Sequence, residues 1–174
     1  MAANLRPSED NGASTPFSTE QAVDYYLNAG VPTGKIVLGI PLYGRTFQNT
    51  TGPGRPFSGI GNGSWESGIW GYKALPRPGA VEIYDATIGA SFSYNTPTKE
   101  FVTYDALENV IQKVEYTKAK ALGGSMFWEI SADRTDDKSL TLASANKLGS
   151  LGRSQSWLSY PQSRYDNIRN GLRG

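Results

Sequence analysis

The sequence predicts a parallel α/β fold that is interrupted by a small antiparallel insertion. Two nearly continuous apolar runs, at 36–40 and 125–130, are typical of parallel strands that are buried on both faces. A segment with helical periodicity precedes the second run, and another helical segment follows it. The order strand, insertion, helix, strand, helix describes one extended right-handed crossover, which is the building unit of parallel sheets.

The first predicted element is a helix from Thr19 to Ala29. Ser18 followed by Gln21 forms a capping-box pattern at its start, and Gly30 and Pro32 end it. A strand is then expected within a few residues.

That strand is predicted to span Lys35–Phe47. Alternation with a period of two places Gly39, Pro41, Tyr43 and Arg45 on one of its faces.

From about 48 to 103 the chain is rich in Gly, Pro, Ser and aromatic residues, which indicates a small antiparallel unit. The expected strands of this unit are Val81–Tyr84, Ser91–Tyr94 and Glu100–Thr103. Asp105 then serves as the expected N-cap of a long helix that ends at Gly123-Gly124.

The second buried strand is predicted at Ser125–Ile130, with Met126, Trp128 and Ile130 on one face. A final helix is expected at Leu140–Leu148. The polar tail after it carries three aromatic residues and is expected to pack on the surface; these are Trp157, Tyr160 and Tyr165.

The composition excludes several classes of chemistry. The chain has 174 residues, no cysteine and no histidine, which removes thiolate nucleophiles, disulfides, imidazole bases and the usual zinc or haem ligands. A formal charge of +1 without a basic block argues against nucleic acid or a membrane as a partner. No cofactor is expected.

The chain also offers no targeting signal by these criteria. No apolar run approaches the roughly 20 residues that span a bilayer, and the first eleven residues are too polar for a signal peptide. The localisation of this chain is therefore left unknown. Two acceptor triplets for N-glycosylation, at Asn49 and Asn62, suit a secreted protein.

Three stretches, at 35–47, 63–75 and 122–133, together resemble the fungal type of glycoside hydrolase family 18 chitinases, and the segment 160–169 is similar to the end of such enzymes. The resemblance implies an incomplete (β/α)₈ TIM barrel, namely its last two β/α units with an inserted small α+β domain. It divides the chain into a barrel part at 1–47, a chitinase insertion domain at 48–103 and a second barrel part at 104–174.

The resemblance also implies a sugar-binding wall. Trp128 would form the aromatic floor beneath the sugar at the cleavage subsite, with Met126 beside it. Tyr43 and Arg45 would donate hydrogen bonds to the sugar and its acetamido group. The insertion would add two further substrate-binding residues, Glu66 and Trp70.

The residues that cleave chitin in this family are not found in the sequence. The family uses an Asp-x-x-Asp-x-Asp-x-Glu run, in which the last residue is the general acid and the acetamido oxygen of the substrate is the nucleophile. That spacing does not occur here. Asp133, Asp136 and Asp137 cluster after the second strand, but capping and solvation explain them better than catalysis or a metal site. No catalytic residue and no metal ligand is therefore predicted.

Two functional hypotheses follow. The first is the C-terminal part of a chitinase that binds chitin or chito-oligosaccharides but does not hydrolyse them alone, whereas its full-length, extracellular parent would. The second is a non-catalytic carbohydrate-binding or self-associating module. Because two strands leave sheet edges unpaired, the expected partners include another copy of the chain or the missing half of the barrel.

Overall fold

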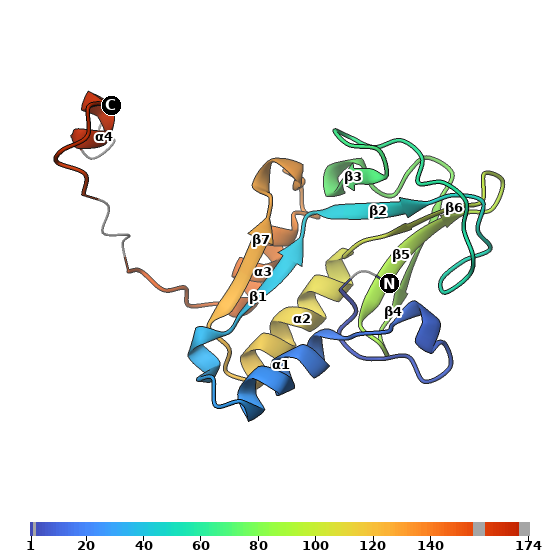
Figure 1. The fold of residues 1–174 in the computed structure, drawn as a ribbon, viewed down its shortest axis with the longest axis horizontal. Helices are drawn as coiled ribbons and strands as arrows, with labels where there is room; N and C mark the ends of the chain where they lie inside the picture. Colours follow the sequence, from blue (N-terminus) through green and yellow to red (C-terminus); the bar gives the residue numbers. More distant parts are fainter. Residues whose placement is uncertain (2, 155–158, 171–174) are drawn as a thin grey trace.

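The computed structural model describes residues 1, 3–154 and 159–170. Within this part of the chain the strands form two sheets (Figure 1). The smaller sheet consists of β1, Val37–Pro41, and β7, Gly124–Trp128. These two strands run parallel and lie side by side, as the sequence predicts.

The larger sheet is antiparallel and has the strand order β3-β2-β6-β5-β4 among the described residues. Its strands are β2 (Tyr43–Phe47), β3 (Ile69–Gly71), β4 (Val81–Asp85), β5 (Ala90–Asn95) and β6 (Glu100–Thr103). The three strands predicted between 81 and 103 are thus confirmed. The sequence did not predict β3, whose three residues are too short for a recognisable alternation.

The single strand predicted at Lys35–Phe47 is wrong in one respect, because it is interrupted at Leu42 and its halves belong to different sheets. Figure 1 shows β2 leaving the end of β1 and entering the larger sheet. The backbone N–H of Leu42 donates to the carbonyl of Trp128 at 2.8 Å. Its carbonyl accepts from the N–H of Tyr72 at 2.9 Å, so Leu42 is bonded to both parts of the fold.

The helices follow the predicted caps with one exception. Helix α1, Thr19–Asn28, begins at Ser18, whose hydroxyl accepts from the N–H of Gln21 at 3.3 Å. Helix α3, Leu140–Leu148, begins at Ser139. The other helices are α2 (Leu107–Ala119) and α4 (Asp166–Arg169), and 3₁₀ turns span Gly12–Ser14, Thr33–Lys35, Tyr72–Ala74 and Ile130–Ala132.

The exception is Asp105, which is not the N-cap of α2; Ala106 occupies that position and makes no side-chain cap. The carboxylate of Asp105 is buried and lies 2.6 Å from the ammonium of Lys113. It also accepts from the amide of Asn109 at 2.6 Å. Burial raises the pKa of Asp105, whereas the charge and hydrogen bond of Lys113 lower it. The pair therefore fixes the end of β6 against α2.

The main core lies where the two sheets and α2 meet. Its fully buried side chains include Ile40, Leu42, Val102, Tyr104, Val110, Val114 and Leu140. Helix α2 contacts both α3 and β7, so it supports the smaller sheet from one side. No helix in the described residues is both long and apolar enough to cross a membrane.

The tail does not pack on the fold as expected. Figure 1 shows α4 apart from the other elements, and Tyr160 and Tyr165 are each more than half exposed. Trp157 lies outside the described residues.

Removing one partner of the buried ion pair should strongly destabilise the fold. Lys113→Met leaves the carboxylate of Asp105 buried without a counter-charge, which typically costs about 3–5 kcal/mol. Lys118→Met is the matched control, because Lys118 lies on the same helix and its exposed ammonium donates to the carbonyl of Lys147 instead of forming a buried ion pair. Denaturant unfolding monitored by circular dichroism measures both. Equal transition midpoints for the two variants would contradict the assigned role of the pair.

A second prediction concerns acid stability. Burial raises the pKa of Asp133, but hydrogen bonds from Thr141, Leu140 and Arg134 outweigh burial and leave this pKa below its ordinary value. A carboxyl with a lowered pKa stabilises the fold above its unfolded pKa of about 3.9, and this contribution is lost as the pH falls through the folded pKa. Asp133→Asn should therefore lower the free energy of unfolding at pH 7 by roughly 1.5–3 kcal/mol.

The difference between the parent and Asp133→Asn should then shrink below about pH 4. Unfolding measured across a pH series checks this, with Asp10→Asn as an exposed control. A difference that stays constant down to pH 2 would show that the charge of Asp133 plays no part.

Candidate functional site

A hollow of about 330 Å³ opens at the end of the paired strands β1 and β7. Four of the six predicted substrate-binding residues line it, from two sheets. They are Tyr43 and Arg45 of β2 and Met126 and Trp128 of β7. The remaining lining residues are Ala3, Gly39, Ile40 and Pro41.

The register of the parallel strands explains why these residues meet. Gly39 pairs with Met126, and Pro41 pairs with Trp128. Neighbouring residues in a sheet point to the same face, so one face of β1 and β7 carries all four. The methionine side chain packs over Gly39, where a Cβ would lie 3.5 Å from the methionine Cε, an ordinary van der Waals contact.

Three side chains of the hollow are exposed, namely Arg45, Met126 and Trp128, whereas Ile40 is buried beneath them. The side chain of Trp128 is 67% exposed, although tryptophan is usually well buried. The Arg45 guanidinium lies 5.9 Å from the centre of the Tyr43 ring and makes no hydrogen bond or ion pair within the described residues. The hollow therefore combines an aromatic floor with unused donors, and none of its lining residues is acidic.

The structure does not bring the two insertion residues to this hollow. Trp70 is partly buried against the main core, and the guanidinium of Arg77 lies 3.7 Å from its ring centre. Glu66 is exposed and forms an isolated bridge with Ile69. Neither residue is among those that line the hollow.

The acidic residues after β7 are engaged in local bonds. Asp133 holds the start of α3 by accepting from the N–H groups of Leu140 and Thr141. Arg134 donates to Asp136 and lowers the pKa of Asp136 to about 2. The described residues contain no group of three side chains that could hold a metal ion. Glu129 accepts from the hydroxyl of Ser131 at 2.5 Å.

A larger hollow of about 780 Å³ adjoins the first and shares Arg45 with it. Apart from Arg45, the sequence did not predict its lining residues, among them Phe47, Arg55 and Phe57. The signal for Phe47 was present, because it continues the alternation of Tyr43 and Arg45 by one step. Phe57 and Arg55 lie in a loop, where no periodicity predicts the direction of a side chain.

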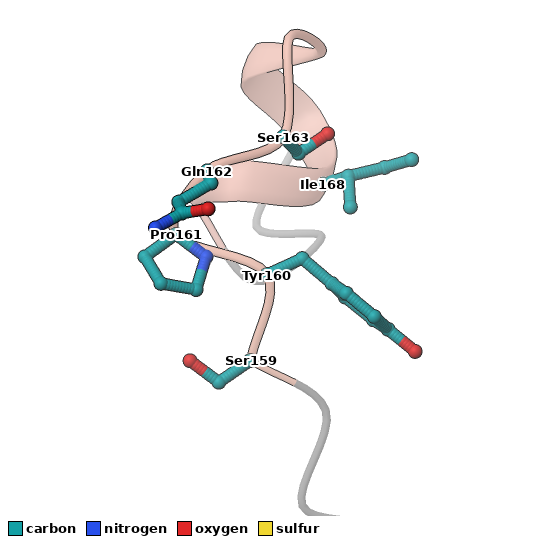
Figure 2. Close-up of a pocket in the computed structure, with 6 residues that line it drawn as sticks. All are labelled: Ser159, Tyr160, Pro161, Gln162, Ser163 and Ile168. Atoms are coloured by element: carbon teal, nitrogen blue, oxygen red, sulfur yellow. The ribbon is translucent and has the colours of Figure 1, made fainter.

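A further hollow in the tail is a weaker candidate. It is lined by Ser159, Tyr160, Pro161, Gln162, Ser163 and Ile168, all from one short segment. Figure 2 shows Tyr160 and Ile168 extending to one side while Pro161 and Gln162 lie on the other. Binding sites usually have a few polar groups that converge on the ligand, and such convergence is absent from these six residues.

Comparisons with known proteins identify the family of the chain. The family model described as glycosyl hydrolases family 18 matches residues 1–133. The chain is 52% identical over 167 residues to Endochitinase 1 of Metarhizium robertsii, an alignment that covers 96% of this chain and 39% of that protein. The chain thus spans about two fifths of the length of this curated relative.

Solved structures show the same relationship. The catalytic domain of a psychrophilic chitinase B from Arthrobacter TAD20 has a TM-score of 0.75 and 31% sequence identity, covering 84% of this chain and 33% of that one. A GH18 chitinase from Cycas revoluta, solved in complex with (GlcNAc)3, has a TM-score of 0.67 and 31% identity, covering 78% and 40%. With a family match over three quarters of its residues, the chain belongs to the glycosyl hydrolases of family 18.

Proposed function

We propose that this chain forms a sugar-binding wall of a family 18 chitinase. In this proposal the smaller sheet and its helices are the last two β/α units of a (β/α)₈ barrel, and residues 48–103 are an inserted domain. The whole protein would hydrolyse β-1,4 linkages between N-acetylglucosamine units of chitin by the substrate-assisted retaining mechanism. The chitinases that resemble the chain support this proposal.

The observation that carries the proposal is that Arg45 of β2 and Trp128 of β7 line one hollow, although their strands belong to different sheets. The exposed indole can pack against the apolar face of a pyranose. The Arg45 guanidinium and the Tyr43 hydroxyl can donate to the oxygens of the sugar and its acetamido group. The (GlcNAc)3 bound to the chitinase from Cycas revoluta is a ligand of this chemistry.

We further infer that the isolated chain does not hydrolyse its ligand. Protonation of a glycosidic oxygen needs a carboxylic acid within hydrogen-bond reach, and no lining residue of the hollow carries one. The general acid would come from strands that this sequence does not contain, consistent with the way barrel active sites collect residues from several strand ends. Glu66 and Trp70 would reach a sugar only where the ligand extends over the insertion.

The second candidate function is a non-catalytic chitin-binding or self-associating module. The same observation favours it, because a hollow with an aromatic floor, two donors and no carboxylate is complete for binding. The two candidates differ in what the missing barrel half would do. Adding that half would restore hydrolysis in the first case and would leave binding unchanged in the second.

Binding and turnover of a short chito-oligosaccharide test the proposed function. The purified chain should bind the disaccharide of N-acetylglucosamine with saturation and release no product. Trp128→Ala should weaken binding at least tenfold, which corresponds to about 1.4 kcal/mol. Trp65→Ala is the control, because Trp65 is 58% exposed but lines neither hollow.

Isothermal titration and a reducing-sugar assay measure the two quantities. Hydrolysis by the chain alone would overturn the inferred lack of activity. An equal loss of affinity in Trp128→Ala and Trp65→Ala would remove the support for the assigned hollow.

The open sheet also predicts self-association. Strands β1 and β7 form a two-stranded sheet, so each has one edge without a partner strand in the described chain. Val37 of β1 lies on the face of this two-stranded sheet that is open to solvent, and it is 53% exposed. Val37→Lys should shift the chain toward the monomer, because a charge on this face opposes its burial.

Sedimentation velocity over a concentration series measures this shift. Val81→Lys serves as the control, since Val81 is 65% exposed on the edge strand β4 of the other sheet. If the chain is monomeric at all concentrations, or if both variants behave alike, association through the smaller sheet is wrong.

A further inference from the structure

Asn62 lies in the exposed, glycine-rich loop that leads to β3. It begins the triplet Asn62-Gly63-Ser64, which has the sequence of an acceptor for N-glycosylation. The residue is exposed, and its side-chain amide makes no hydrogen bond within the described residues. The nitrogen that would carry a glycan is therefore accessible in the folded chain.

The backbone around Asn62 is held by contacts that do not involve its side chain. The carbonyl of Asn62 accepts from the N–H of Gly68 at 3.1 Å, which closes the loop. A Cβ at Gly63 would overlap the carbonyl oxygens of Glu66 and Ile69, so only glycine fits at this position. A glycan on the side chain of Asn62 would leave these contacts intact.

The second acceptor triplet, which begins at Asn49, is placed differently. Asn49 has a φ of 53°, and its side-chain amide donates to the carbonyl of Ser58 at 2.8 Å. The next residue, Thr50, is buried. A glycan is attached to the nascent chain, and the fold must then leave room for it. At Asn49 the glycan would have to fit beside an existing bond, so the structure favours Asn62.

Trp65 offers an apolar surface close to the amide of Asn62. It is 58% exposed, although tryptophan is usually well buried. One edge of its ring packs over Gly71 of β3, where a Cβ would lie 3.2 Å from the indole Cζ3. Trp65 follows Asn62 by three positions, so their Cα atoms lie at most about 11 Å apart. A sugar on the asparagine side chain can span a distance of this order and place its apolar face on the indole.

We propose that Asn62 carries an N-linked glycan when the chain passes through the secretory pathway, and that the first sugar of this glycan packs on Trp65. In the transfer step, the amide nitrogen of Asn62 attacks C1 of the first N-acetylglucosamine of a lipid-linked oligosaccharide. A C–N bond forms, and the lipid diphosphate leaves C1 with the bonding electrons, while the amide gives up one proton to a base of the transferase. The inference does not rest on the proposed function, because neither Asn62 nor Trp65 lines the hollow around Trp128.

Occupancy of Asn62 is tested by expressing the full chain behind a cleavable secretion signal in a eukaryotic host. Site-resolved mass spectrometry of the secreted chain should find a glycan on Asn62. Ser64→Thr keeps the hydroxyl that the acceptor triplet requires and should keep the glycan, whereas Ser64→Ala should lose it. Ser67→Ala is the matched control, because Ser67 is exposed in the same loop and belongs to no triplet. An unmodified Asn62 in the secreted parent chain would overturn the assigned site.

The contact with Trp65 is tested by thermal unfolding of the same secreted chain. Because the contact exists only in the folded state, the glycosylated parent should melt about 2–4 °C above Asn62→Gln. This gain should persist after an endoglycosidase has trimmed the glycan to its first sugar, and it should be lost in a Trp65→Ala background.

Phe17→Ala provides the matched background for this comparison, because Phe17 is 82% exposed and lies outside the loop. If the glycan stabilises the Trp65→Ala and Phe17→Ala backgrounds equally, the first sugar does not pack on Trp65. Loss of the gain on trimming to one sugar would lead to the same conclusion. Both measurements are independent of chito-oligosaccharide binding, so a failure here leaves the proposed function untouched.

Discussion

The whole arrangement depends on how the backbone passes through Leu42. This residue is fully buried, and its two backbone hydrogen bonds join β7 on one side and the segment after β3 on the other. A buried backbone group without a partner costs free energy, so each of the two bonds stabilises this path of the chain. The alternation of core-facing and solvent-facing side chains is therefore preserved where the chain passes from one sheet to the other. For this reason Pro41 and Tyr43 line the same hollow although they belong to different sheets.

The packing behind β2 enforces the same geometry. A Cβ at Gly44 would lie only 2.8 Å from side-chain atoms of both Leu75 and Val102, so the strand approaches the core more closely than any other residue type allows. Alternation then turns Arg45 toward solvent. The buried pair of Asp105 and Lys113 holds the end of the neighbouring strand β6 against α2. The exposed groove is thus positioned by contacts that lie entirely beneath it.

Sequence reasoning predicted the elements better than their connections. The helix start at Ser18 and the parallel pairing of the two apolar strands follow from local signals, and both are confirmed. The break at Leu42 left no such signal, because the residues on both sides of it alternate without interruption. Asp105 has the residue type and spacing of an N-cap, but a buried ammonium eight positions later attracts its carboxylate. For Trp70, too, the local sequence does not determine the environment of the side chain. An aromatic residue near a glycine-rich loop can support the core or face a ligand.

Sugar binding and bond cleavage require different side chains at a site. Sugar binding needs an exposed ring and donors in a fixed arrangement, and Trp128 of β7 together with Tyr43 and Arg45 of β2 would supply them around one hollow. Cleavage needs in addition an acid whose pKa suits proton donation and whose position is fixed to within hydrogen-bond distance of the leaving oxygen. The acids nearest to Trp128 in sequence are committed to local bonds, with Glu129 bonded to Ser131 and Asp133 bonded to the start of α3. In the proposed function, the side chains that would bind a sugar line a hollow without any carboxylate, so binding would not depend on the acid that hydrolysis needs.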